Sequence, residues 1–291
     1  MSNWQQKTHE RLEEHLLKLL KEAVKSGPIM NMDETTVEVC GEEGRANTTK
    51  SYLWLARGGP PGKPVSIYQY HPTRAGEHIK SFLNGFDGYL QTDGYPAYDS
   101  VLKEPKYAHI IHVGCFVHAR RYFFEASKVI KNPKPALEGK AYIDELYSIE
   151  QQLREKDLPL EQFRAQRKEA VLPVFAAFHA WLVKQQSMGL IGRLAAAVNY
   201  TLNQWEKLIK YIESPYLTPD NNLSENGIRP LALGRKNWMF FKSPDGAMSG
   251  CTLYSLIETA EHNELNPQKY LTYLFEHAPY AKSLDDWIQQ F

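Results

Sequence analysis

The sequence is poor in cysteine and has no long apolar run. Its three cysteines, Cys40, Cys115 and Cys251, are scattered and odd in number, which argues against a disulfide framework and favours a reducing compartment. No stretch reaches the roughly 18 apolar residues of a transmembrane helix, and the polar N-terminus lacks the apolar core of a signal peptide. We therefore predict a cytoplasmic protein with no membrane partner.

Net charge is also absent, because 34 basic residues balance 34 acidic ones. Any binding of nucleic acid must then come from local patches. Glycine and proline, at 18 and 17 of 291 residues, are near average usage, which excludes collagen-like and low-complexity chains. The 43% hydrophobic share is typical of a globular protein, and the length suits one large domain or two small ones.

The first half of the chain has the pattern of an α/β protein. Leucines at helical spacing predict a leading helix within 1–28. The segment 29–131 then alternates aromatic and β-branched runs with helical patterns, which predicts a mixed sheet with helices on its faces. The expected strands are 29–40, 51–59, 64–71, 88–94 and 109–115, and the expected helices are 73–83, 96–101 and 116–131.

The second half reads as mainly helical. Within 132–217 apolar residues recur at helical spacing, which predicts an all-α insertion whose charged residues form solvated faces. The segment 218–265 returns to the core with a helix from 221, which Pro230 is expected to end or kink. Residues 238–241 form a strand or a turn. Two short helices, starting near Pro267 and Ser283, are expected in the tail 266–291.

Three acidic residues lie at distinctive places. Asp33 is inside the first expected strand, Asp93 ends the fourth, and Glu225 is in the late helix. A charge within an apolar strand is costly unless it is paired or metal-bound. Neighbouring first and fourth strands would bring two carboxylates together, and the third would complete a cage for two Mg²⁺ ions. Alternatively, Asp33 and Asp93 cap strand ends or form turns. Rivals for the three roles are Glu34, Asp99, Asp220 and Asp245.

A second cluster surrounds the end of the fifth expected strand. His112, Cys115 and His118 form H-x2-C-x2-H, but no fourth zinc ligand is evident and the spacing fits no common structural site. We favour a strand-to-helix turn that places His118, Arg120 and Arg121 beside the acidic edge, where the arginines contact phosphates. An ordinary basic helix face is the alternative.

A basic segment follows the third acid. Its charges and one aromatic residue suit a nucleic-acid backbone, although a solvated turn region would have the same composition. These residues are Arg229, Arg235, Lys236, Trp238 and Lys242. The run from Gly58 to Lys63 is one residue short of a phosphate-binding loop and holds two prolines, so we interpret it as a hairpin tip.

Several blocks in order resemble the insertion-sequence-66 family of bacterial DDE transposases. They cover about residues 12 to 285 and include MDETTVEV, SYLWLARGGPPGKPV, HPTRAGEHIKSFLNGFDGYLQTDGYPAY, VGCFVHARRYFFEA, LNQWEKL, DNNLSENGIRPLALGRKNWMFF and LYSLIETAEHN. The resemblance implies an RNase H-like mixed five-stranded sheet flanked by helices, with an all-α insertion between the second and third catalytic acids. It implies cleavage and strand transfer of DNA, dependent on Mg²⁺ or its substitute Mn²⁺, with Asp33, Asp93 and Glu225 as catalytic metal ligands.

The resemblance has departures and further implications. Family members usually carry an N-terminal DNA-binding extension, which we expect this chain to lack, and Asn226 replaces a basic residue after the third acid. Expected partners are transposon-end and target DNA, a second copy on DNA, and accessory proteins of the same element. Two alternatives stay open: an RNase H-like nuclease without strand transfer, and a truncated, non-catalytic remnant that binds DNA or a partner.

Overall fold

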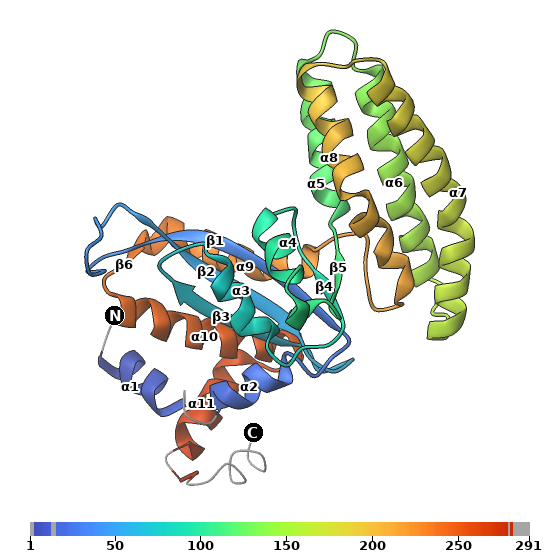
Figure 1. The fold of residues 1–291 in the computed structure, drawn as a ribbon. Helices are drawn as coiled ribbons and strands as arrows, with labels where there is room; N and C mark the ends of the chain where they lie inside the picture. The colour runs from blue at the N-terminus through green and yellow to red at the C-terminus, as the bar shows by residue number, and fades with distance from the viewer. Residues whose placement is uncertain (1–2, 13–15, 279, 282–291) are drawn as a thin grey trace. The chain divides into compact units, whose positions relative to one another are not determined.

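The computed structural model describes residues 3–12, 16–278 and 280–281 of the chain. The fold divides into two compact units, which are coloured along the chain in Figure 1. Unit 1 comprises Met1–Leu90, Pro96–Ile111 and Asn222–Phe291. Unit 2 comprises Gln91–Tyr95 and His112–Asn221. No helix in the described part of the chain is both long and apolar enough to cross a membrane.

A mixed sheet organises unit 1, and this confirms the predicted mixed α/β, RNase H-like fold class. The sheet has the strand order β3-β2-β1-β4-β5, with β6 paired to β1 in parallel. The first three strands are antiparallel neighbours, and β1 and β4 are adjacent, as predicted. The strands are β1 (Ile29–Val39), β2 (Lys50–Gly58), β3 (Val65–His71), β4 (Tyr89–Gln91), β5 (Ile111–Val113) and β6 (Phe240–Phe241).

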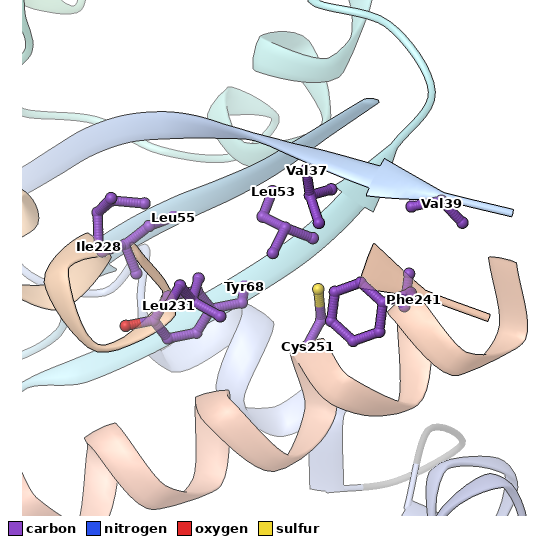
Figure 2. Packing of buried hydrophobic residues seen from close by; sticks show 10 residues of the cluster. Val37, Val39, Leu53, Leu55, Tyr68, Ile228, Leu231, Phe241 and Cys251 are labelled. Carbon is purple, nitrogen blue, oxygen red and sulfur yellow. The ribbon is translucent and has the colours of Figure 1, made fainter. Parts of the chain in front are cut away.

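One face of the sheet is covered by α9 (Asn222–Trp238) and α10 (Pro244–His262). Alternate residues of β1 and β2 point to this face because side chains along a strand alternate between faces. They pack with apolar side chains of the two helices, as Figure 2 shows. The cluster comprises Val37, Val39, Leu53, Leu55, Tyr68, Ile228, Leu231, Phe241, Ala247 and Cys251.

The opposite face of the sheet meets α3 (Gly76–Leu83) and α4 (Pro96–Leu102). The fully buried Trp54 of β2 contacts the His78 ring of α3 and the Tyr98 ring of α4, each with its centroid 6.4 Å away. A satellite cluster joins α1 (Asn3–Leu12), α10 and α11 (Pro267–His277). A further helix, α2 (Lys18–Ala23), packs near β3. The second tail helix expected near Ser283 lies outside the described residues.

Helix α10 also covers the outer edge of the sheet, where β3 is the last strand. The hydroxyl of Ser255 accepts a hydrogen bond from the backbone N–H of Tyr68, at 2.9 Å. The hydroxyl of Thr259 accepts from the N–H of Ser66, at 3.0 Å, and donates to its carbonyl. Side chains of a helix therefore take the place of a neighbouring strand along this part of the edge.

Unit 2 is a helical bundle joined to the ends of β4 and β5 (Figure 1). Its helices pack through apolar stripes, and α5 and α6 approach closely where a Cβ on Gly139 would lie 2.5 Å from the Phe123 ring. The elements are α5 (Phe116–Val129), α6 (Lys134–Arg154), α7 (Leu160–Ser187), α8 (Gly192–Leu208) and the 3-10 helix η3 (Ile209–Glu213).

Two local predictions need correction. Pro230 was expected to end or kink its helix, and the first of these is wrong, because α9 continues to Trp238. The buried Ile228 and Leu231 on either side of this proline hold the helix against the sheet, which offsets the missing backbone hydrogen bond. Asp93 does not end β4 but lies two residues beyond it, in a turn.

Candidate active site

Asp33 lies on the sheet face that α9 covers. Its cross-strand partner in β2 is Leu55, and directly opposed residues of an antiparallel pair point to the same face. Leu55 belongs to the cluster beneath α9 and α10. The backbone N–H of Glu34 donates to Oδ1 of Asp33, at 2.8 Å. The first predicted acid is thus half-buried in a strand and directed at a helix-covered face.

Glu34, the adjacent rival, points to the other face. Its side chain is 1% exposed and forms an ion pair with Arg74. The hydroxyl of Tyr98 donates to its second carboxylate oxygen, at 3.1 Å. These contacts hold the Glu34 side chain on the opposite face of the sheet. Asp33 is therefore the acid of β1 that faces α9.

Glu225 lies in the first turn of α9, and that helix is fixed closely onto β2 and β3. Arg57 of β2 donates to the carbonyl of Leu223, at 3.2 Å, and Tyr68 of β3 donates to the carbonyl of Gly227, at 2.6 Å. A Cβ on Gly227 would lie 2.6 Å from Cδ2 of Leu55. Leu55 is the cross-strand partner of Asp33. The start of α9 therefore packs on the pair of strands that carries Asp33.

Asp93 belongs to unit 2, in the turn after β4. Its Oδ1 accepts from the backbone N–H of Tyr95, at 2.9 Å, which is the contact of an Asx turn. The next residue, Gly94, lies against the ring of Tyr200 from α8: a Cβ there would be 2.8 Å from the tyrosine oxygen. The turn-forming alternative for Asp93 therefore describes its local hydrogen bonding, and this bonding engages one of the two carboxylate oxygens.

His118 and Cys115 lie together at the start of α5. A ring nitrogen of His118 lies within 4.8 Å of the Cys115 sulfur. That thiol is buried and accepts from the backbone N–H of Asn221, at 3.2 Å. His112 bonds instead to the hydroxyl of Thr92, at 2.8 Å. Among the described residues, His112 does not join Cys115 and His118 in a group of possible metal ligands.

The predicted basic residues differ in their exposure and in whether an acidic side chain already pairs with them. Arg120 is paired with Asp144, with 2.6 Å between Nε and Oδ1. Arg121 is exposed and has no ion pair within the described part of the chain. In α9, Arg229 is exposed. The side chains of Arg235, Lys236 and Trp238 lie outside the described residues, although their backbone belongs to α9.

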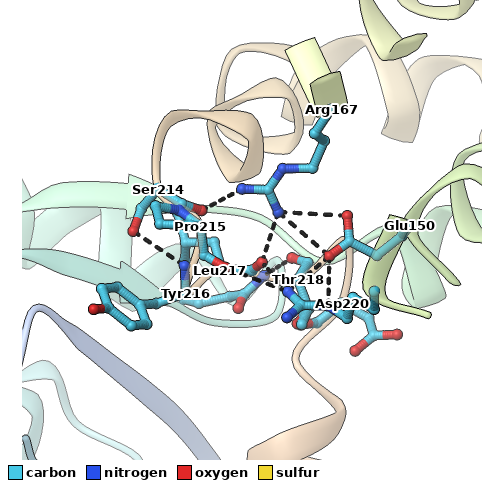
Figure 3. Close-up of polar contacts among 10 residues, drawn as sticks. Glu150, Arg167, Ser214, Pro215, Tyr216, Leu217, Thr218 and Asp220 are labelled. Atoms are coloured by element: carbon cyan, nitrogen blue, oxygen red, sulfur yellow. Dashed lines mark hydrogen bonds and ion pairs between the residues drawn. The ribbon is translucent and has the colours of Figure 1, made fainter. Parts of the chain in front are cut away.

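Sequence reasoning missed a buried polar network in unit 2, drawn in Figure 3. Arg167 of α7 is 0% exposed and pairs with Glu150 of α6, at 3.3 Å. It also donates to the carbonyls of Ser214 and Leu217. The interpretation of charged residues in this segment as solvated faces is therefore wrong for this pair. A signal was present, because Arg167 shares the helical spacing of Phe163, Val171 and Val174, all of which are buried.

Burial shapes the electrostatics of this network. Desolvation lowers the pKa of Arg167, and the charge of Glu150 opposes that effect. Arg154 also pairs with Glu150, at 2.7 Å, and donates to the carbonyl of Leu217, at 3.1 Å. The Arg167 guanidinium stacks 4.8 Å from the Phe163 ring centroid. Two arginines thus share one carboxylate and satisfy carbonyls that follow η3.

The segment 214–221, which the network holds, also contacts the strand ends. The Gln91 side chain of β4 donates to the carbonyl of Thr218, at 2.8 Å. The backbone N–H of Phe116 donates to the carbonyl of Pro219, at 2.9 Å. The segment is thus hydrogen-bonded to Gln91, two residues before Asp93, and to the first residue of α5. Its last residue directly precedes α9.

Comparison with known proteins identifies relatives over nearly the whole chain. A family model described as "Transposase IS66 family" matches residues 1–249, and one described as "IS66 C-terminal element" matches residues 255–289. No solved structure matches the chain.

Curated relatives include two uncharacterized proteins of Sinorhizobium fredii. The chain is 31% identical to y4hP over 82% of its own length and 46% of that protein. It is 29% identical to y4qI over 86% of its length and 48% of that protein. The chain therefore spans about half the length of the curated relatives it matches.

Proposed function

The chain belongs to the IS66 transposase family, and we propose that it is a catalytic region that cleaves and joins DNA strands with divalent metal ions. One observation carries the proposal beyond family membership. The first turn of α9, with Glu225, is fixed over the strand pair of Asp33, although the two acids are far apart in sequence. The adjacency of β1 and β4 in the sheet supports Asp93 as the third member.

The donor set of this site suits Mg²⁺. Asp33, Asp93 and Glu225 offer only carboxylate oxygens, the ligands that hard cations prefer, and each side chain is partly exposed. A pair of ions held there would supply Lewis-acid activation of the attacking oxygen and charge stabilisation of the leaving one. The three carboxylates would hold the ions, and the Asx turn, in which Oδ1 accepts from the N–H of Tyr95, would orient the Asp93 carboxylate.

Cationic side chains would bind the DNA backbone. Arg121 and Arg229 are exposed and would bind phosphates, which supply most of the affinity for DNA. His118 would position a phosphate or move a proton. If His118→Ala leaves metal-dependent strand transfer unchanged, that assignment for His118 is wrong.

The test uses pre-cleaved ends of the DNA element that encodes this chain. Asp33→Asn, Asp93→Asn and Glu225→Gln are each expected to reduce strand joining by more than about 100-fold, since changes even to outer-shell groups cost about 10–100-fold. Each should also weaken Mn²⁺ binding, measured by electron paramagnetic resonance of the free ion; Mn²⁺ shares the octahedral oxygen preference of Mg²⁺. The control is Asp87→Asn, at an exposed acid of unit 1.

The outcomes separate the candidate functions. Cleavage of supplied DNA without joining identifies a nuclease. Absence of Mn²⁺ binding together with absence of cleavage identifies a non-catalytic remnant. Equal activity in the three acid variants and the control overturns the assignment of the site.

A further inference from the structure

We propose that Tyr122, backed by Tyr200, forms a stacking platform for a nucleobase of the DNA beside Asp93. This inference rests on the proposed function, because DNA is the substrate there. Both tyrosines belong to unit 2, on α5 and α8, so the platform is built within one compact unit.

The two rings form an open pair. Their centroids are 4.6 Å apart, with 31° between the ring planes. Tyr122 is 44% exposed, whereas Tyr200 is half-buried. Tyr200 thus supports one side of the pair, and Tyr122 presents aromatic surface to solvent. Large aromatic side chains bury well against flat partners, and a nucleobase offers such a face whatever its sequence.

The pair is placed directly against the Asp93 turn. A Cβ on Gly94 would lie 2.8 Å from the oxygen and 3.1 Å from a ring carbon of Tyr200. Only glycine leaves this space, so the tyrosine ring packs on the backbone next to the second acid. Burial raises the pKa of the Tyr200 hydroxyl, and the charges of Cys115 and Asp93 add to that shift. These contributions agree with a position beside the proposed site.

A cation next to the platform would serve the phosphate of the same nucleotide. Arg121 precedes Tyr122 in the chain, is exposed, and has no ion pair with any described residue. Its charge reaches Tyr200, where it lowers the hydroxyl pKa. Arg120, one residue earlier, is held by Asp144. An aromatic platform combined with a cation is the arrangement that binds single-stranded nucleic acid without sequence preference.

The proposal is tested by binding alone, in Ca²⁺ or chelator, so that catalysis plays no part. The probes are a fluorescently labelled short oligothymidylate and the same strand with abasic sites, measured by fluorescence anisotropy. Tyr122→Ala is expected to weaken binding of the oligothymidylate about tenfold, the order of one lost base stack, with little change for the abasic strand. Tyr122→Phe keeps the ring and should bind like the unaltered chain.

A matched control lies on the same helix. Phe124 is also an exposed aromatic residue of α5, at 41%, and its ring faces Lys128, with 4.1 Å between Nζ and the ring centroid. Phe124→Ala should leave both affinities unchanged. Thermal unfolding of each variant separates loss of binding from loss of folding.

Three results would overturn the platform: unchanged binding in Tyr122→Ala, an equal loss for both strands, or an equal loss in Phe124→Ala. The last would mean that the contribution of Tyr122 is shared by exposed aromatic residues of α5 in general. The tests of the proposed function use Mn²⁺ binding and strand joining in the acid variants. Their outcome does not change the anisotropy measurement, so a failure of the proposed function and a failure of the platform can be told apart.

Discussion

At the scale of single residues, Glu258 of α10 lies in an unfavourable setting for a carboxylate. It is 5% exposed, and burial, reinforced by Glu261 and opposed by Arg57, raises its pKa to about 7. His262 lies 3.9 Å away, but burial lowers the pKa of that histidine to about 4. The imidazole is therefore neutral at pH 7 and offers no opposite charge.

Glu258→Gln is expected to stabilise the protein above pH 7. Below pH 4.5 the carboxyl is protonated in both the folded and unfolded states, and its favourable contribution is lost as the pH rises through about 7. At pH 8 the variant should gain about 1–3 kcal/mol in free energy of unfolding, with no gain at pH 4. Urea titrations at both pH values measure this. Glu276→Gln, at an exposed position of α11 whose charge does not contribute to the Glu258 pKa, is the control, and an equal gain at pH 4 would contradict the argument.

At the scale of elements, the Arg167–Glu150 pair joins α6 and α7 to the segment 214–221. Removing one partner of a buried pair leaves a charge and carbonyls without their hydrogen bonds. Arg167→Met is therefore expected to lower the free energy of unfolding by about 3–5 kcal/mol. Adding Glu150→Leu should restore part of the loss, because the buried carboxylate, then held by Arg154 alone, is removed as well.

The same helix offers a control for this prediction. Arg164 of α7 pairs with Glu161 at 3.5 Å, but the two side chains are 41% and 82% exposed. Arg164→Met should change the free energy of unfolding by less than about 1 kcal/mol, as is usual for surface pairs. Denaturant titration of both variants makes the comparison, and similar losses would mean that burial of Arg167 has no special weight.

At the scale of the whole molecule, the proposed metal site links ligand binding to stability. An ion that binds only the folded chain stabilises it by about 2.7 kcal/mol at a hundredfold excess over the dissociation constant. Mn²⁺ should therefore raise the unfolding temperature of the unaltered chain and raise it less in Asp33→Asn or Glu225→Gln. Calorimetry with and without Mn²⁺ measures this, and an equal rise in all three proteins would place the ion elsewhere.

The sequence predicts the local pattern of this molecule better than its tertiary consequences. The first strand was expected at 29–40 and spans Ile29–Val39, because alternation and β-branching are local signals. The short β4 ends before Asp93 because a side-chain hydrogen bond to Tyr95 forms a turn there. Pro230 stays helical because packing on both sides outweighs a local preference.

In the candidate site, too, some residues can be identified from the local sequence and others depend on distant contacts. Asp33 stands out in sequence as a charge within an apolar strand and Glu225 as an acid of the late helix, and the family resemblance assigns the same two residues. The burial of Arg167 depends on Glu150, Phe163 and the carbonyls of a distant segment. The helical spacing of Arg167 with buried apolar residues places it on the inner face of α7, but the α7 sequence does not show which distant groups would pair with it there.

The hydroxyls of α10 along β3 have a consequence for aggregation. The β3 sequence VSIYQYH has no acidic, lysine or arginine residue, and an open edge of this composition is a template for cross-β growth. Ser255 and Thr259 occupy that edge, and both lie within the part of the chain that matches the C-terminal element of the family. These two side chains therefore satisfy backbone groups of β3 that would otherwise be open to pairing with a strand of another molecule.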